Sequence, residues 1–195
     1  DKHIPFVHNV KNTDMVVAID DNNTHNLLRL FNHEVGHEYL MEETGLSKEA
    51  LDQLAFLGIS GIANVLGLIK MAKYYELTEK DVLLTVATDS AEMYQSRIAE
   101  LDEIETYNHD PAVRDYWHNL KSMKTDNMEE FTYWSRKRVH NLKYYTWVEQ
   151  QGRTLEELNA QWYDDEYWHN IHNQVDEIDA LTEAFNKASG VLERL

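Results

Sequence analysis

Two short apolar runs stand out in a chain whose other apolar positions mostly recur at helical spacing. They cover residues 14–20 (DMVVAID) and 81–88 (DVLLTVAT), and both are rich in Val and Leu. Continuous apolar runs of this length are typical of strands that are buried on both faces of a sheet. We therefore predict strands near 14–20 and 81–88.

The residues between these two runs favour helices. A long helix is expected over residues 23–43, a short one over 47–56 and a strongly apolar one over 60–77, which Ser60 would cap. A strand, helices and a second strand in this order predict a parallel pair of strands with a crossover connection. The fold class that follows is α/β, with a segment of parallel sheet covered by crossover helices.

The pattern changes after Tyr107. Residues 108–195 are helical in pattern and dense in aromatic residues, and they contain no convincing run for a strand. Most of these aromatic side chains are expected in cores and interfaces. We predict two parts, an α/β part at 1–107 and a helical, aromatic-rich extension at 108–195.

Composition narrows the class of function. The 195 residues include 35 acidic and 18 basic side chains, so that the net charge is −17. Nucleic acids and anionic membrane surfaces need a basic face, and we expect neither as a partner. Cysteine is absent, which excludes disulfides, a thiolate nucleophile and zinc held by cysteine. No apolar run approaches the roughly 20 residues of a membrane span, and a soluble, cytoplasmic protein is expected.

The sequence HEVGH, which begins at His33, matches the zinc-protease pattern H-E-x-x-H. On a helix, His33 and His37 would lie one turn apart on the same face, with Glu34 as the general base for a zinc-bound water. The pattern supplies no third ligand, and Glu49 and Asp52 are the nearest candidates. The alternative, which we favour, is the polar face of an amphipathic helix.

Polar residues follow the second predicted strand. In a parallel sheet, ligands bind beyond the carboxyl ends of the strands, where Thr88, Asp89 and Ser90 would lie. Asp89 could instead cap the helix that follows, with Glu92 completing a capping box. Both interpretations can hold at once.

The sequence GISGIAN places Gly58 and Ser60 at the start of the apolar helix. One interpretation is a capped helix N-terminus whose glycines allow close packing. The other is a polar loop beside a ligand crevice, because helix N-termini favour anions.

Taken together, GISGIAN and the stretch TDSAEMY that ends at Tyr94 resemble the fold type II pyridoxal-phosphate enzymes, a cysteine synthase-like and tryptophan synthase beta-like superfamily. In that family Gly-Ile-Ser-Ser-Gly-Ala opens a helix, and a later strand ends in Pro-Ser-x-Gly-Glu-Arg-Tyr. The order of KHIPF and DMVVAIDDNNTHNLLRLF also fits, so that the resemblance covers roughly residues 2–100. The beta subunit of 2-amino-4-oxopentanoate thiolase is a related possibility.

The resemblance implies a lyase or transferase that binds pyridoxal 5′-phosphate and an amino-acid substrate, as a homodimer or with a partner subunit. It implies that this chain is the C-terminal segment of a longer enzyme and is inactive alone, since the family's Schiff-base lysine lies upstream. Asp89 stands where the family has a serine at the pyridine nitrogen, and a carboxylate would keep that nitrogen protonated. Thr88, Ser90, Gly58 and Ser60 would lie beside it.

Two other functions stay open at this level. One is a zinc metalloprotease that uses His33, Glu34 and His37. The other is a helical interaction module, in which the aromatic-rich residues after 110 pack against a partner subunit.

Overall fold

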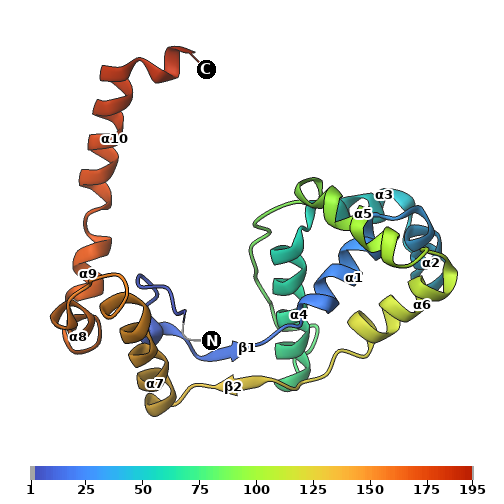
Figure 1. Cartoon of the computed structure of the whole chain (residues 1–195), viewed down its shortest axis with the longest axis horizontal. Coiled ribbons are helices and arrows are strands. Elements are labelled where there is room, and N and C mark those ends of the chain that lie inside the picture. Colours follow the sequence, from blue (N-terminus) through green and yellow to red (C-terminus); the bar gives the residue numbers. More distant parts are fainter. Residues whose placement is uncertain (1–2, 195) are drawn as a thin grey trace. The chain divides into compact units, whose positions relative to one another are not determined.

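The computed structural model describes residues 3–194, and about 67% of the chain is helical (Figure 1). The chain divides into two compact units. One unit comprises Asp1–Val16 and Glu130–Leu195, and the other comprises Val17–Glu129. Residues 3–16 therefore pack with the C-terminal part of the chain, a grouping different from the boundary near residue 107 that the sequence suggested.

The predicted α/β fold is wrong. Within residues 3–194 the sheet has two strands, β1 (Met15–Val17) and β2 (Met128–Glu130). They run antiparallel, because the Ala18 amide donates to the Asn127 carbonyl at 2.9 Å and the Phe131 amide donates to the Asp14 carbonyl at 2.7 Å. The predicted parallel pair of 14–20 with 81–88, and its crossover helices, does not form.

Residues 81–88 form no strand, and Figure 1 draws them as a long open segment between α4 and α5. The exposed fractions of Val82, Leu84 and Val86 are 92%, 89% and 66%. Alternate residues of an extended segment point to the same side, so one side of this segment is apolar and faces water. The sequence of this segment is typical of a strand, but no strand among the described residues pairs with it.

The unit Val17–Glu129 contains a helical core. Leu27, Leu28, Leu30 and Leu66 are completely buried in it. Its helices and turns are α1 (Asp21–Asn32), α2 (Glu34–Thr44), α3 (Lys48–Asp52), η2 (Gln53–Phe56), α4 (Ile59–Tyr74), η3 (Ala91–Tyr94), α5 (Gln95–Ile104), α6 (His109–Tyr116) and the π-helical turn η4 (Trp117–Lys121). The short and the apolar helices that the sequence predicts at 47–56 and 60–77 are present, as α3 with η2 and as α4.

The long helix predicted over 23–43 is divided at His33. This residue has extended backbone angles, φ −99° and ψ 141°, and serves as the N-cap of α2. The ends of α1 and α2 approach each other so closely that a Cβ on Gly36 would lie 2.1 Å from the Leu30 carbonyl oxygen. Glycine is therefore required at this break, and the break separates the two histidines of HEVGH.

A buried network of charges joins α1 to α6. The Nη2 atom of Arg29 lies 3.5 Å from the Asp115 carboxylate, and its guanidinium lies 4.3 Å from the centre of the Tyr107 ring. Asp115 has no exposed surface and also accepts a bond from Arg114 Nε at 3.2 Å. Arg114 in turn binds both carboxylate oxygens of Glu105, at 2.9 and 2.8 Å. Burial raises the pKa of Tyr107 well above its usual value.

The other unit is organised around Lys143. Its fully buried ammonium group donates to the carbonyl of Phe6 at 2.9 Å, the carbonyl of His8 at 2.7 Å and the side-chain oxygen of Gln161 at 2.8 Å. These bonds tie the N-terminal segment to two helices. The elements here are η1 (Val10–Asn12), α7 (Tyr133–Lys143), the π-helical turn η5 (Tyr144–Val148), α8 (Leu155–Tyr163), α9 (Tyr167–His172), α10 (Val175–Ser189) and η6 (Val191–Arg194).

None of the helices in residues 3–194 is, by itself, long and apolar enough to cross a membrane. The pair Lys48–Phe56 and Ile59–Tyr74 reaches the length and composition of a span only when both helices are added together. The chain bends by 109° between them. Ile62 and Leu66 of the second helix belong to the buried core just described.

Candidate functional site

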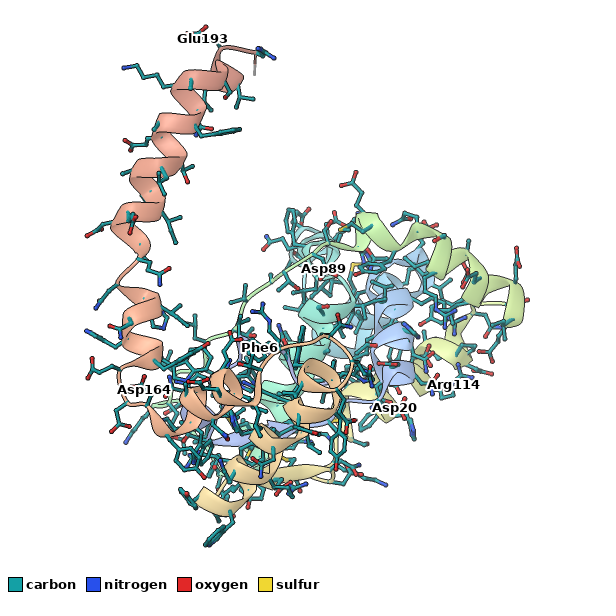
Figure 2. The ribbon with its side chains drawn as sticks, turned by 60° about the vertical axis from the view of Figure 1, so that its left-hand side comes forward. Phe6, Asp20, Asp89, Arg114, Asp164 and Glu193 are labelled. Carbon is teal, nitrogen blue, oxygen red and sulfur yellow. The ribbon has the colours of Figure 1, made fainter. Side chains whose placement is uncertain are left out.

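A polar cluster surrounds Asp89, where the open segment 81–88 reaches the start of α4 (Figure 2). The amide of Gly58 donates to the backbone carbonyl of Asp89 at 2.9 Å. The Asp89 carboxylate accepts a hydrogen bond from the Thr88 hydroxyl at 3.1 Å and a short one from the Tyr94 hydroxyl. The first amides of α4 lie near this carboxylate and help to lower its pKa. The cluster thus joins two segments that lie far apart in the sequence.

The Asp89 carboxylate lies at the N-terminus of α4. The N-cap residue of α4 is Gly58, which has no side chain to bind the first amides of the helix. The nearby amides of Ser60 and Gly61, in the first turn, help to lower the pKa of Asp89. A negative charge at this end is also favourable for the helix dipole. Ser60, which the sequence predicts as the cap, lies inside the helix instead.

The capping box predicted for Asp89 with Glu92 does not form. The turn that follows, η3, has Ser90 as its N-cap residue, and this serine makes no capping bond through its side chain. Since the carboxylate of Asp89 is directed to α4 and Tyr94, it serves the preceding helix rather than the following one.

Gly58 allows the close approach on which the cluster depends. A Cβ at this position would lie 2.6 Å from the Asp89 carboxyl carbon and 2.7 Å from one of its oxygens. Such distances are shorter than any normal contact between nonbonded atoms. The contact with Asp89 therefore explains why position 58 is a glycine, which the sequence GISGIAN could only suggest.

The surroundings of Asp89 favour its ionised form. The hydrogen bond from Tyr94 is the largest cause that lowers the pKa of Asp89, and Thr88 and the two backbone amides act in the same direction. Partial burial opposes them. The same hydrogen bond raises the pKa of Tyr94. At neutral pH the cluster therefore holds a carboxylate beside a neutral phenol.

The residues that the sequence singled out for a cofactor lie together in this cluster. Gly58 is buried, Asp89 and Ser90 are half-buried, and Thr88 and Ser60 are exposed. Sequence reasoning missed that Tyr94 binds Asp89. The motif TDSAEMY contains both residues, but a separation of five residues has no fixed meaning in a loop that leads into a turn.

The HEVGH motif does not form a pair of zinc ligands on one helix face, which was the less favoured of its two interpretations. The Nδ1 atom of His33 accepts the amide of Val35 at 3.2 Å, as a helix cap. The Nε2 atom of His37 donates to the Phe31 carbonyl at 2.6 Å, and its Nδ1 lies 3.6 Å from the Asp52 carboxylate. Across residues 3–194, no group of three or more His, Asp or Glu side chains could hold a metal ion.

Two of the hollows among residues 3–194 adjoin Lys70 and Trp134, and both lie away from Asp89. One of about 420 Å³ adjoins Lys70, whose ammonium group already donates to the Ala18 carbonyl at 3.0 Å and to the carbonyl and carboxylate of Asp126 at 2.8 and 3.1 Å. The other, of about 680 Å³, lies between α7, η5 and α8 and includes Trp134 and Tyr145. Neither is lined by residues of the Asp89 cluster.

The chemistry available at Asp89 is that of a fixed anion. A half-buried, ionised carboxylate can accept a hydrogen bond from a protonated ring nitrogen or from an amine. Its position is set by two segments of backbone and by Tyr94. Comparisons with protein-family models, curated proteins and solved structures found no match to this chain.

Proposed function

We propose that this chain is the C-terminal segment of a pyridoxal-phosphate-dependent lyase or transferase that acts on an amino acid, with Asp89 as the partner of the pyridine nitrogen. The observation that supports this proposal is that Gly58, Ser60 and Thr88 lie beside Asp89, whose carboxylate is ionised. These are the residues that the resemblance to fold type II enzymes implies at the cofactor. The parallel sheet from which a ligand site at Thr88 and Asp89 was also expected does not form, so the proposal depends on the resemblance and on this proximity.

The Asp89 carboxylate fits a protonated pyridine nitrogen in charge and in access. One oxygen binds Tyr94, while the other binds the hydroxyl of Thr88, an exposed residue. The Thr88 hydroxyl can rotate away, which frees a lone pair for a ring N–H. Asp89 would then hold the proton on the nitrogen, while Tyr94 holds the carboxylate in place. When bound, the cofactor supplies an electron sink for the substrate, and a protonated nitrogen makes that sink stronger.

The open segment before Asp89 supports the part of the proposal that concerns a longer enzyme. Val82, Leu84 and Val86 expose an apolar side to water, and the structure shows no backbone bonds for residues 82–85. An extended, apolar, unpaired segment is a template for pairing with another strand. We propose that the remainder of the enzyme supplies that strand, together with the lysine that binds the cofactor.

Isolation of the protein from its native source tests whether it is part of a longer enzyme. Antibodies against residues 3–194 would recover the natural product, whose mass and visible absorption are then measured. We expect a mass well above 23.0 kDa and, after borohydride reduction, a pyridoxyl-lysine in a peptide outside the sequence given. A natural product of 23.0 kDa without cofactor absorption would overturn the proposal.

Substitution of Asp89 tests the role of the carboxylate in the cofactor-bound enzyme. We expect Asp89→Asn and Asp89→Ser to shift the absorption and fluorescence of the bound cofactor, because the pyridine nitrogen loses its proton. Asp110→Asn is the matched control, since the Asp110 side chain is 98% exposed and belongs to α6, outside the Asp89 cluster. Far-ultraviolet circular dichroism establishes that each variant is folded. Unchanged cofactor spectra in a folded Asp89→Asn enzyme would remove the assigned role.

A further inference from the structure

The hollow beside Trp134 lies within one unit of the chain and has the size of a small-molecule site. Its walls are α7, the π-helical turn η5 that continues α7, and α8. All of them belong to the segment Glu130–Leu195. Its volume of about 680 Å³ falls within the range of roughly 300–1,000 Å³ that is usual for small-molecule sites. The function proposed for Asp89 makes no use of this hollow.

Buried polar contacts hold the two helices on either side of the hollow together. The Nε2 atom of His140, on α7, donates to the Leu158 carbonyl of α8 at 3.0 Å. The ammonium group of Lys143, at the end of α7, donates to the side-chain oxygen of Gln161 at 2.8 Å. All four residues are buried, and Leu158 also lines the hollow. The walls are therefore fixed before any ligand binds, as in most small-molecule sites.

Three aromatic side chains line the hollow without being buried in it. Trp134, Tyr144 and Tyr145 are 77%, 37% and 42% exposed. The rings of the two tyrosines meet edge to face, with 5.8 Å between their centres and 84° between their planes. Both tyrosines come from the π-helical turn η5, and such turns occur frequently at functional sites. Exposed rings around a hollow can stack on a flat ring of a ligand.

The charged side chains of the hollow are basic. Lys137 and Arg138 line it, and among the described residues that do so none is acidic. The chain as a whole has the opposite balance, with 35 acidic and 18 basic residues. The ammonium group of Lys137 lies 4.6 Å from the centre of the Trp162 ring and 4.3 Å from that of Tyr163. These ring faces hold the ammonium group in place but do not neutralise its charge.

We propose that this hollow binds a small aromatic carboxylate, a molecule with a flat ring and a single negative charge. The ring would stack against Trp134 and the tyrosines of η5, while the carboxylate would lie near Lys137 and Arg138. Asn141 and Asn159 add side-chain amides that can bind further polar groups of the ligand. The net charge of −17 repels ions of high negative charge, so a singly charged ligand suits this site better than a nucleic acid.

Isothermal titration calorimetry of the full chain at low ionic strength tests the site, with indole-3-acetate and its uncharged amide as probes. We expect indole-3-acetate to saturate one site with a dissociation constant of about 1 mM or lower, and the amide to bind more weakly. The double variant Lys137→Gln with Arg138→Gln should weaken binding of the carboxylate at least about fivefold and leave binding of the amide unchanged. The control is Lys187→Gln with Arg194→Gln, two exposed residues of the same unit whose loss changes the net charge equally.

Substitution of Trp134 and nuclear magnetic resonance locate the bound ring. Because Trp134 is 77% exposed, Trp134→Ala should leave the chain folded, as circular dichroism would show, and should weaken binding of both probes. Indole-3-acetate should shift the indole N–H resonance of Trp134 but not that of Trp117, which belongs to the other unit. The proposal is overturned by a wild-type chain that shows no saturable binding, by binding that leaves the Trp134 resonance unshifted, or by equal weakening in the two double variants.

Discussion

The carboxylate of Asp89 occupies the space that a side chain on Gly58 would need. A Cβ on Gly58 would lie 2.6 Å from the Asp89 carboxyl carbon. Helix α4 thereby begins at a residue that cannot cap it through a side chain, and the ionised carboxylate of Asp89 lies beside its first turn. The same carboxylate is the group that we propose for the cofactor. Stability of α4 and chemistry at the site therefore share one side chain.

Two glycine-to-alanine substitutions in α4 should distinguish the contact between Gly58 and Asp89 from the general effect of glycine in helices. We expect Gly58→Ala to lower the free energy of unfolding by about 2 kcal/mol, because the methyl group displaces the Asp89 carboxylate. Gly67→Ala in the same helix is the control, since a Cβ there would meet no atom within 4 Å. It should raise the free energy of unfolding by about 0.5–1 kcal/mol. Urea unfolding measures both, and equal effects of the two substitutions would contradict the proposed contact.

The pKa of Asp89 links the stability of α4 to pH. Because the hydrogen bond from Tyr94 lowers this pKa from its ordinary value of 3.8, the ionised carboxylate stabilises the folded state above that pH. The stabilisation is lost as the pH falls through the lower, folded-state pKa. We expect the difference in unfolding free energy between wild type and Asp89→Asn to be constant at neutral pH and to shrink below pH 3.8. A difference that does not change with pH would show that the charge does not contribute.

The sequence predicted α4 and the proximity of Gly58 to Asp89, but not the sheet. Strand β2 (Met128–Glu130) has the sequence MEE, which contains no apolar run to indicate a strand. Residues 81–88 have such a run but find no neighbouring strand among the described residues. Apolar runs report the preference of a segment for burial, whereas a strand also requires a partner, and a partner is a property of the tertiary structure.

The break in the helix at HEVGH is not visible in the sequence either. Helical spacing was correct on both sides of His33, yet the backbone is extended there, and Gly36 allows α2 to approach the Leu30 carbonyl. Local patterns cannot reveal such a break, because the contact forms only when two helices turn back on one another. The histidines consequently serve as a cap and as a donor to a carbonyl.

Removal of Asp115 should be among the most destabilising single changes in its unit. The carboxylate is fully buried and faces Arg29, so Asp115→Ala leaves a buried guanidinium without one of its partners. We expect a loss of about 3–5 kcal/mol in the free energy of unfolding. The double variant Arg29→Met with Asp115→Leu should recover part of that loss, since neither charge remains buried. Asp110→Ala in the same helix, whose side chain is 98% exposed, should change the stability by less than about 0.5 kcal/mol.

His140 should make its unit sensitive to mild acid. Burial, with a contribution from the charge of Lys143, lowers the pKa of His140 to about 4 from 6.5, and its Nε2 donates to the Leu158 carbonyl at 3.0 Å. Between pH 6.5 and 4 the unfolded chain binds a proton that the folded chain does not. The free energy of unfolding therefore decreases as the pH is lowered through this window. The expected loss is on the order of 3 kcal/mol. Urea unfolding at several pH values should show a smaller slope for His140→Gln, and an unchanged slope for His169→Gln, an exposed control.

The exposed apolar side of the open segment should lower the solubility of this chain without changing its free energy of unfolding. Val82, Leu84 and Val86 are 92%, 89% and 66% exposed, so their replacement by Thr removes few contacts within the chain. We expect the triple variant to unfold at the same urea concentration as wild type. It should scatter less light at high concentration, because apolar, unpaired segments associate with one another.

Val7→Thr is the control, since Val7 is 78% exposed but stands outside the open segment. If the three residues instead packed within this chain, the triple variant would lose stability. In the longer enzyme that we propose, the same substitutions should weaken the attachment of this segment, which limited proteolysis would detect.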